Sequence, residues 1–372
     1  MSEYQFVHFI AIDRPLSDEQ MEFMQRQSTR ATISRREFSN EYHYGDFHGE
    51  SLEMMRRGFD LHLHFANYGI RKLMFRLPAG LPCGKAAFKP FALKYNLDWT
   101  PDNKEPGGVL SIQPESDGER WDSYVAGLED MLTELTPVRE MLMAGDLRPL
   151  YLAWLACNPC EGKEPPVPAG LRKLPAALRV FTDFYEVSDD LLQAAAEESA
   201  AMDERSVPKL PIREWLEGQS PAEHRRLLEQ VLLDETGIVR ADTLAEIRKS
   251  LKVAAWPVTR TKRTIDDLRE FAEQQAAIQR VMESAAQEKE QLLRLKRMKE
   301  NPAATVEAIM NLIAQRSTQK YSEAVALLCQ LRDVLGPDDG PPFTQAVAQQ
   351  LRKQTPAPRG LISLLKKHEF LK

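Results

Sequence analysis

The segment Tyr4-Gln5-Phe6-Val7-His8-Phe9-Ile10-Ala11-Ile12 decides the fold class of this chain. Side chains alternate between the two sides of a β-strand, so positions 4, 6, 8, 10 and 12 share one face and positions 7, 9 and 11 share the other. Both faces are largely apolar, which is typical of a strand that is covered on both sides. We therefore expect residues 4–12 to form a strand in the middle of a sheet.

The residues that follow predict alternating helices and strands. Ser17, with Gln20 three positions later, forms a capping box that predicts a helix over residues 18–27. Residues 29–44 alternate loosely and predict one bent strand or a hairpin, and residues 72–77 predict a further strand. Weaker strand patterns follow over residues 91–98 and 108–113. Between these strands, apolar residues at helical spacing predict one amphipathic helix through Leu52, Met55, Phe59, Leu63 and Ala66.

This order of elements favours an α/β sandwich, with a ferredoxin-like arrangement as one form of it. Of the 29 aromatic residues, 16 lie in the first 118 positions, and aromatic residues favour strands and dense cores. The rest of the chain is mainly helical by pattern, so the predicted class is α+β. We expect an α/β domain over 1–118, a helical domain over 119–260, a long charged helix over 261–300 and a C-terminal helical hairpin module over 301–372.

The long helix is predicted over residues 264–299. A heptad seam passes through Leu268, Phe271, Gln275, Ile278, Met282, Ala285, Lys289 and Leu292. Three of these eight positions are polar or small, which favours a solvent-crossing helix over a stable coiled-coil dimer. After it, residues 303–317 and 321–335 predict two helices joined by a short turn, an αα-hairpin of the kind found in repeat arrays. A single copy of such a unit needs a neighbour to cover its apolar face.

Composition excludes several classes of protein. The 372 residues carry 49 basic and 55 acidic side chains, and this net charge of −6 excludes a wholly basic nucleic-acid coat. Four cysteines are too few for a disulfide-stapled scaffold, and no apolar run approaches the length of a membrane span. The first residues lack the basic and apolar regions of a signal peptide. We therefore expect a cytoplasmic protein with no membrane partner.

The sequence also lacks the common motifs of several enzyme classes. It contains no Gly-x-x-x-x-Gly-Lys-Ser/Thr loop, no Gly-x-Gly-x-x-Gly fingerprint, no Gly-x-Ser-x-Gly elbow and no His-Glu-x-x-His. The ATPase, nicotinamide-dependent, α/β-hydrolase and zincin interpretations lose their usual support. We predict no catalytic residue and no cofactor.

Several long motifs resemble those of a widespread family of bacterial proteins to which no function is assigned. They are residues 4–6 with 11–16, residues 39–47, residues 145–154 and residues 165–171. The resemblance spans most of the chain and implies a bacterial cytoplasmic protein, without an activity. The hairpin segment 321–328 is similar to the C-terminal helical region of bacterial SWIM zinc-finger proteins, although the Cys-x-Cys and Cys-x-His pairs of that finger are absent. No metal or DNA binding is therefore implied.

Cysteine and histidine residues offer weak signals for metal or redox chemistry. Cys157 and Cys160 form a Cys-x-x-Cys pair at the end of a predicted helix, where the helix dipole does not lower a thiol pKa, and no second pair completes a zinc site. His62 and His64 are expected to diverge on a helix, with His64 beside Asp60. We predict no metal site. The minority alternative is a hydrolytic metal centre built from His43, Asp46, His48 and Asp60.

The segment 40–49 is the most unusual in composition, with aromatic, histidine and acidic residues around two glycines. Exposed, it would be a recognition loop, because aromatic side chains give contact area at a low entropy cost. Buried, it would be an aromatic strand end followed by a turn. The candidate binding residues are Arg14, Glu41, Tyr42, His43, Tyr44, Asp46, Phe47 and His48.

The leading hypothesis is a non-enzymatic protein-interaction or scaffold protein whose partner is another protein. The candidate contact residues are at the basic end of the long helix and on the hairpin: Arg294, Lys296, Arg297, Lys299 and Tyr321. Because the basic run lacks interleaved aromatics, we do not expect nucleic acid as the partner. Two alternatives stay open, an accessory subunit of a bacterial regulatory or defence system, and a ligand- or metal-binding enzyme that uses the histidine- and acid-rich N-terminal segment.

Overall fold

The computed structural model describes residues 3–43, 45–78, 80–102, 107–115, 127–157, 159–202, 212–233, 239, 243, 246–247, 255–353 and 358–371. The chain divides into two compact units, Met1–Gln275 and Ala276–Lys372, which we call the N-terminal unit and the C-terminal unit.

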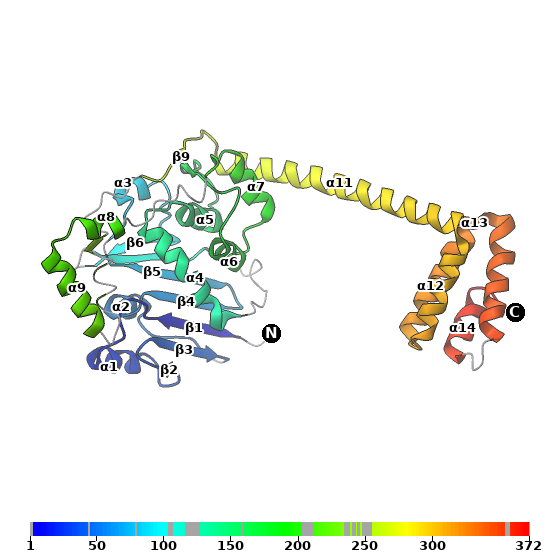
Figure 1. The fold of residues 1–372 in the computed structure, drawn as a ribbon, viewed down its shortest axis with the longest axis horizontal. Helices are drawn as coiled ribbons and strands as arrows, with labels where there is room; N and C mark the ends of the chain where they lie inside the picture. Colours follow the sequence, from blue (N-terminus) through cyan, green and yellow to red (C-terminus); the bar gives the residue numbers. More distant parts are fainter. Residues whose placement is uncertain are drawn as a thin grey trace. The chain divides into compact units, whose positions relative to one another are not determined.

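A seven-stranded antiparallel sheet forms the centre of the N-terminal unit (Figure 1). Its order is β2-β3-β1-β4-β5-β7-β6. The strands are β1 (Gln5–Ile10), β2 (Thr32–Ile33), β3 (Glu37–Tyr42), β4 (Leu61–Ala66), β5 (Ile70–Leu77), β6 (Leu97–Pro101) and β7 (Gly108–Ile112). Strand β1 lies between β3 and β4, which confirms the predicted central strand.

The first four strands have a ferredoxin-like arrangement, one of the forms expected from the sequence, but the fourth of them is Leu61–Ala66 and not the strand expected over residues 72–77. Along the chain the elements run β1, α1 (Asp18–Gln27), β2, β3, α2 (Ser51–Arg57) and β4, and in the sheet these strands lie in the order β2-β3-β1-β4. Strands β5, β7 and β6 extend the sheet beyond β4. The capping box of α1 is present, since Gln20 N donates to Ser17 Oγ at 3.3 Å and Ser17 N donates to Gln20 Oε1 at 2.7 Å.

One predicted helix is shorter than expected. Helix α2 ends at Arg57, and Leu61–Ala66 is the strand β4. Gly58 ends the helix, with its amide bonded to Met54 O at 3.2 Å. The apolar residues after it occur at every second position, a spacing that fits a strand next to β1.

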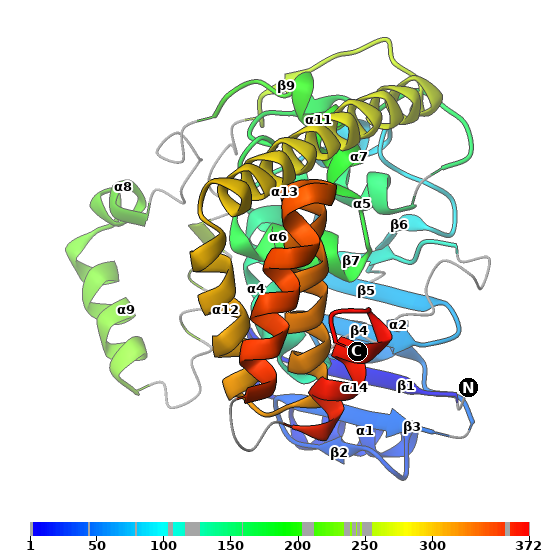
Figure 2. The ribbon, with the colours of Figure 1, turned by 90° about the vertical axis from the view of Figure 1, so that its right-hand side faces the viewer.

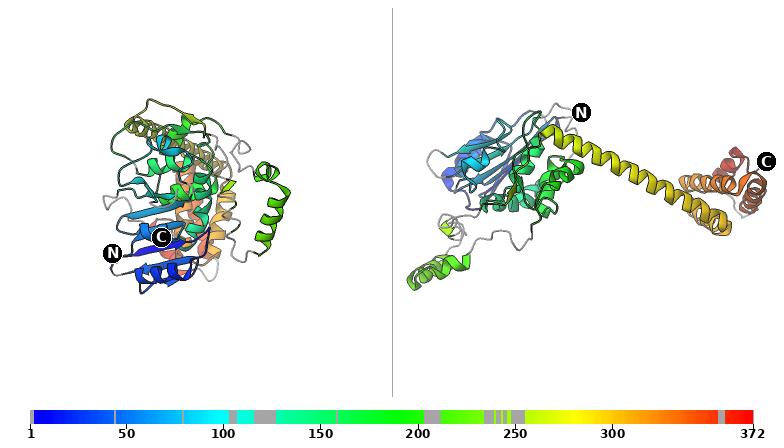
Figure 3. Two further views of the ribbon diagram at one scale, coloured as in Figure 1. Left: turned by 90° about the vertical axis from the view of Figure 1, so that its left-hand side faces the viewer. Right: turned by 90° about the horizontal axis from the view of Figure 1, so that it is seen from above.

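Two apolar cores lie on opposite faces of the sheet. Val7 and Phe9 pack with α1 and α2 on one face, whereas Phe6, Leu63 and Phe75 pack with later helices on the other. These later helices are α4 (Leu128–Met143), α5 (Arg148–Cys157), α6 (Ala176–Phe184) and α7 (Asp189–Glu197). In the view from above in Figure 3, the green helices lie along one side of the blue-to-cyan sheet.

The core between the sheet and helices α4 to α7 also contains residues that lie beyond the predicted domain boundaries at 118 and 260. Trp256, Ile265 and Leu268 are buried in it together with the sheet residues. The short strands β8 (Val167–Pro168) and β9 (Val258–Thr259) pair with each other. The remaining helices of this unit are α3 (Gly84–Phe88), α8 (Ile212–Glu217) and α9 (Pro221–Leu233). The sequence pattern also predicts a helix that begins at Trp121, a linker over 203–210 and a helix over 240–251. The start of the first helix, the linker and most of the last helix lie outside the described residues.

The C-terminal unit is helical, as predicted. It contains the end of the long helix α11 (Ile265–Glu300), then α12 (Pro302–Ala314), α13 (Thr318–Lys353) and α14 (Arg359–Lys367). Helix α13 is interrupted at Gly336, whose φ of 87° is not helical. Figure 2 shows α12, α13 and α14 side by side, and their apolar residues, including Ile309, Leu328 and Leu361, share one core. None of the described helices has the length and apolar character needed to span a membrane.

Candidate functional site

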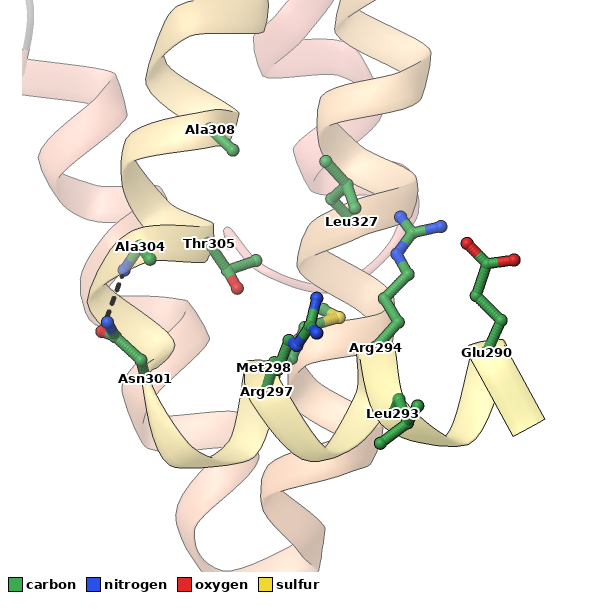
Figure 4. A pocket seen from close by; sticks show the side chains of 10 residues that line it. All are labelled: Glu290, Leu293, Arg294, Arg297, Met298, Asn301, Ala304, Thr305, Ala308 and Leu327. Atoms are coloured by element: carbon green, nitrogen blue, oxygen red, sulfur yellow. Dashed lines mark hydrogen bonds between the residues drawn. The ribbon is translucent and has the colours of Figure 1, made fainter. Parts of the chain in front are cut away.

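A groove in the C-terminal unit is a candidate binding site among the described residues. It has a volume of about 560 Å³ and lies where α11 ends, α12 begins and α13 passes (Figure 4). Met298, Ala308 and Leu327 supply apolar surface. The full lining is Glu290, Leu293, Arg294, Arg297, Met298, Asn301, Ala304, Thr305, Ala308 and Leu327.

Local sequence explains the sharp turn that forms this groove. Asn301 caps α12, because its side-chain oxygen accepts a hydrogen bond from Ala304 N at 3.2 Å, the dashed line in Figure 4. Pro302 follows as the first helical residue, where its missing N–H costs nothing. Met298 is buried at the turn while its neighbours on α11 are exposed. The turn therefore places the last basic residues of α11 beside an apolar wall.

Two arginines of the groove carry unpaired charge. Arg294 and Arg297 are exposed, and within the described part of the chain no ion pair or hydrogen bond of their guanidinium groups is formed. Glu290 lies one helical turn before Arg294 on the same rim. A guanidinium group binds a carboxylate through two parallel N–H bonds, so Arg294 and Arg297 suit an acidic ligand.

The other predicted contact residues of this unit are placed differently. Lys296 and Lys299 are exposed outside the groove lining, and Lys296 lies 3.9 Å from Glu300. Tyr321 is only 7% exposed and packs in the core of the unit. Tyr321 is therefore corrected from a partner-contact residue to a core residue, because its position on α13 faces the other helices.

The aromatic segment 40–49 of the N-terminal unit is partly buried. This agrees with the interpretation of the segment as a strand end followed by a turn. Tyr42 is buried, with its hydroxyl 3.1 Å from Ser28 Oγ. Phe47 packs near Phe9 and Phe38 on the face covered by α1 and α2. Tyr44 lies outside the described residues. The two aromatic side chains thus belong to the core rather than to an exposed recognition loop.

The polar residues of the same segment form two groups rather than one. In the first group His43 Nε2 lies 3.8 Å from Glu41 Oε2, and both residues contact Tyr4. Glu41 accepts a bond from the Tyr4 hydroxyl at 3.3 Å, and the His43 ring lies 5.5 Å from the Tyr4 ring. Asp46 instead bonds Gln5, at 2.6 Å from its Nε2. His48 is exposed.

Gln5, at the start of β1, pairs with Tyr42, and Ile10, at the end of β1, pairs with Glu37. Arg14 follows Ile10 and therefore lies at the end of the strand that is far from Tyr42. Arg14 is therefore corrected as a member of this site, and the predicted set is not brought together. The enzyme alternative needs all of these residues in one pocket, and Arg14 lies outside any pocket that the others could form.

A chain of hydrogen bonds that the sequence did not predict crosses this end of the sheet. His64 Nε2 lies 2.9 Å from Gln5 Oε1, and both Gln5 Nε2 and the Tyr68 hydroxyl donate to Asp46 Oδ1, at 2.6 and 2.9 Å. The bonds from Tyr68 and Gln5 lower the pKa of Asp46. Burial, with a smaller contribution from Lys72, lowers the pKa of His64 to about 4. At neutral pH the chain therefore holds a carboxylate and a neutral imidazole.

His62 and His64 correct the helical prediction, because on β4 they point to the same face of the sheet. The His62 ring stacks on Phe9 with centroids 3.8 Å apart, and its Nδ1 lies 3.1 Å from His8 O. Burial lowers the pKa of His62 well below its usual value and lowers that of Lys72 as well. His62 is fully buried on the face of the sheet that α1 and α2 cover, whereas His64 and Lys72 are half-buried. The alternation of apolar and polar residues from position 61 to 65 is the sequence signal that predicts this strand.

Asp60, the remaining member of the minority metal site, belongs to a buried ion-pair network. Its Oδ2 accepts bonds from Ile12 N and Asp13 N at 2.7 and 2.8 Å, and Arg139 donates to its Oδ1 at 3.1 Å. Arg139 also makes a two-pronged contact with Asp13, at 2.9 and 2.5 Å. Burial raises the pKa of Asp60 and Arg139 opposes that rise. This network fastens α4 to the sheet.

A second buried network joins the helices to the segment before α11. Glu164 has a fully buried carboxylate that accepts two bonds from Arg263, at 2.8 and 2.9 Å. The Tyr151 hydroxyl donates to the same carboxylate at 2.5 Å, and Thr261 Oγ1 at 2.7 Å. Neither network contains a charge that lacks a partner.

Metal and thiol chemistry finds no support in the described residues. No group of three or more histidine, cysteine, aspartate or glutamate side chains in that part of the chain is placed to hold a metal ion. The four cysteines are free, and Cys157 is buried whereas Cys160 is exposed. The Cys157 thiol donates a weak hydrogen bond to Asn96 O at 3.6 Å.

Comparison with known proteins adds no family to this description. No family model, no curated protein and no solved structure matches the chain. The two resemblances drawn from sequence motifs therefore stay predictions.

Proposed function

We propose that this chain is a non-enzymatic, cytoplasmic protein-interaction protein that docks another protein in the groove of its C-terminal unit. The observation that carries the proposal is the pair Arg294 and Arg297, exposed beside an apolar wall and without partners in the described part of the chain. The groove offers the two features of a binding centre, an apolar floor and arginine anchors.

Charge distribution supports an acidic partner. The C-terminal unit has 15 basic and 10 acidic residues, net +5, and the remaining 34 basic and 45 acidic residues give the N-terminal unit −11. A positive unit attracts acidic surfaces and raises their rate of association. Arg294 and Arg297 are three positions apart on one helix, so two carboxylates of one partner segment can meet both.

An accessory subunit of a bacterial regulatory or defence system is a more specific form of the same proposal. Both forms require a protein docked on the chain, and no residue distinguishes between them. The genes that neighbour this one would separate them.

Affinity capture with matched variants tests the proposal. The bait is the full-length tagged chain as wild type, as Arg294→Glu/Arg297→Glu, and as Lys366→Glu/Lys367→Glu, which reverses two exposed charges of α14. We expect a stoichiometric protein that wild type and the α14 variant retain and the groove variant loses. An identical set of captured proteins for all three baits would contradict the proposal.

A further inference from the structure

Helix α9 is the most exposed apolar element of the N-terminal unit. No residue of α9 is buried. Leu228, Val231, Leu232 and Leu233 are between 53% and 76% exposed. Single exposed leucines are ordinary, but a cluster of large apolar side chains in the last two turns of one helix marks an interaction surface.

The neighbouring helix presents α9 without covering it. Helix α8 has no buried residue either. His224 Nε2 of α9 lies 2.7 Å from Leu216 O of α8, and Ser220 Oγ accepts a bond from Glu223 N at 3.2 Å. These contacts fix the turn between the two helices and leave the end of α9 open.

The end of α9 complements the groove in charge. The last turn of α9 has no basic side chain, so the partial negative charge of the helix C-terminus is not compensated within the helix. Glu229 adds a carboxylate to this half of the helix. Arg294 and Arg297 supply the missing positive charge, and Ala308 and Leu327 supply apolar surface for leucines.

We propose that the C-terminal groove of one copy binds the exposed end of α9 of a second copy. The inference rests on the proposed function of the groove and names its partner as the chain itself. The opposite net charges, +5 and −11, favour contact between unlike units of two copies. Each copy carries one groove and one α9, so a copy can give both to a single second copy in a reciprocal dimer, or give them to two different copies in a ring or a filament.

Two complementary variants of the pure full-length protein test this pairing. The groove variant is Arg294→Glu/Arg297→Glu, the helix variant is Leu228→Glu/Leu232→Glu, and the control is Lys366→Glu/Lys367→Glu. All six positions are exposed, so we expect unchanged circular dichroism for each variant. The measurement is molar mass by light scattering across roughly 1–100 μM, the range of a weak to moderate association.

We expect wild type and the control to gain mass with concentration, and each variant alone to associate at least about tenfold more weakly. The decisive sample is an equal mixture of the two variants. The groove variant still has an intact α9 and the helix variant still has an intact groove, so the mixture is expected to form a one-to-one dimer that does not grow.

Three results would overturn the inference. They are a wild type that stays monomeric at every concentration, association that survives in either variant alone, and a mixture that fails to associate. A monomeric wild type would leave the proposed function standing if Arg294→Glu/Arg297→Glu still lost a captured protein of the host. If no protein were lost, the proposed function would fail with it.

Discussion

Two sets of arginines, one in each unit, are placed in opposite ways. In the N-terminal unit, arginines such as Arg139 and Arg263 are held against carboxylates in buried networks. In the C-terminal unit, Arg294 and Arg297 are exposed and make no ion pair with any described residue. A buried charge that loses its partner destabilises the fold, whereas an exposed charge contributes little to stability. The difference indicates that the first set maintains the structure and the second is available to a ligand.

Removing the buried Arg139 should have the largest effect on stability and tests the contrast between buried and exposed arginines. Arg139→Met leaves the Asp60 carboxylate buried without its partner, and we expect a loss of about 3–5 kcal/mol in the free energy of unfolding. Arg35→Met, which removes an exposed pair with Asp18, is the control and should cost less than about 1 kcal/mol. Urea unfolding followed by tryptophan fluorescence measures both, because all tryptophans lie in the N-terminal unit. Equal losses in the two variants would refute the distinction.

Truncating the core of the C-terminal unit tests whether this unit unfolds separately. Leu328→Ala removes a buried side chain and should cost about 2–5 kcal/mol. We expect the far-ultraviolet circular dichroism transition to shift while the tryptophan transition stays unchanged. Leu293→Ala, on the exposed surface of α11, serves as the control and should shift neither transition. A joint shift of both signals in Leu328→Ala would show that the two units unfold together.

His64 should make the stability of the N-terminal unit depend on pH. Its pKa is about 4 in the folded chain and about 6.5 when unfolded, so the folded state binds fewer protons between these values. Stability is therefore lost as the pH falls from 6.5 to 4. His64→Gln should remove roughly 2–3 kcal/mol of that dependence. Urea unfolding at pH 8, 6 and 4.5 gives the slopes, and an unchanged slope in the variant would contradict the burial of this imidazole.

Charge reversal in the groove should have the smallest effect on folding. Arg294→Glu/Arg297→Glu is expected to change the free energy of unfolding by no more than about 0.5 kcal/mol, because both side chains are exposed. Thermal unfolding followed by circular dichroism measures this change. A loss above about 2 kcal/mol would mean that the arginines stabilise the unit instead of serving a partner.

Local patterns in the sequence predicted much of the architecture. The two apolar faces of residues 4–12 identified the central strand, and the Ser17 and Gln20 pair identified the first helix. The long helix and the hairpin followed from helical spacing alone. Strand β4 was missed because Leu63 and Ala66 continue the spacing of α2, and alternation over six residues is a weaker signal than a long amphipathic stripe.

The candidate sites were harder to predict, because their residues are distant in sequence. Asp46 meets Gln5 and Tyr68 only because the start of β1, the loop after β3 and the turn after β4 lie at the same end of neighbouring strands. Charge composition identified Arg294 and Arg297, but the apolar wall that makes a groove of them depends on the turn at Asn301. Tyr321 lies in the core and not on the surface. A helical pattern identifies an apolar face, but it does not tell whether another helix of the same chain or a partner protein covers that face.

The dissociation constant of a captured partner protein tests the central claim most directly. It should be measured for wild type, Arg294→Glu/Arg297→Glu and Lys366→Glu/Lys367→Glu at low and at high salt. We predict that the groove variant binds at least about tenfold more weakly at low salt, that the α14 variant binds like wild type, and that salt weakens wild type toward the groove variant. Equal affinity of the groove variant and wild type would show that these arginines do not hold the partner.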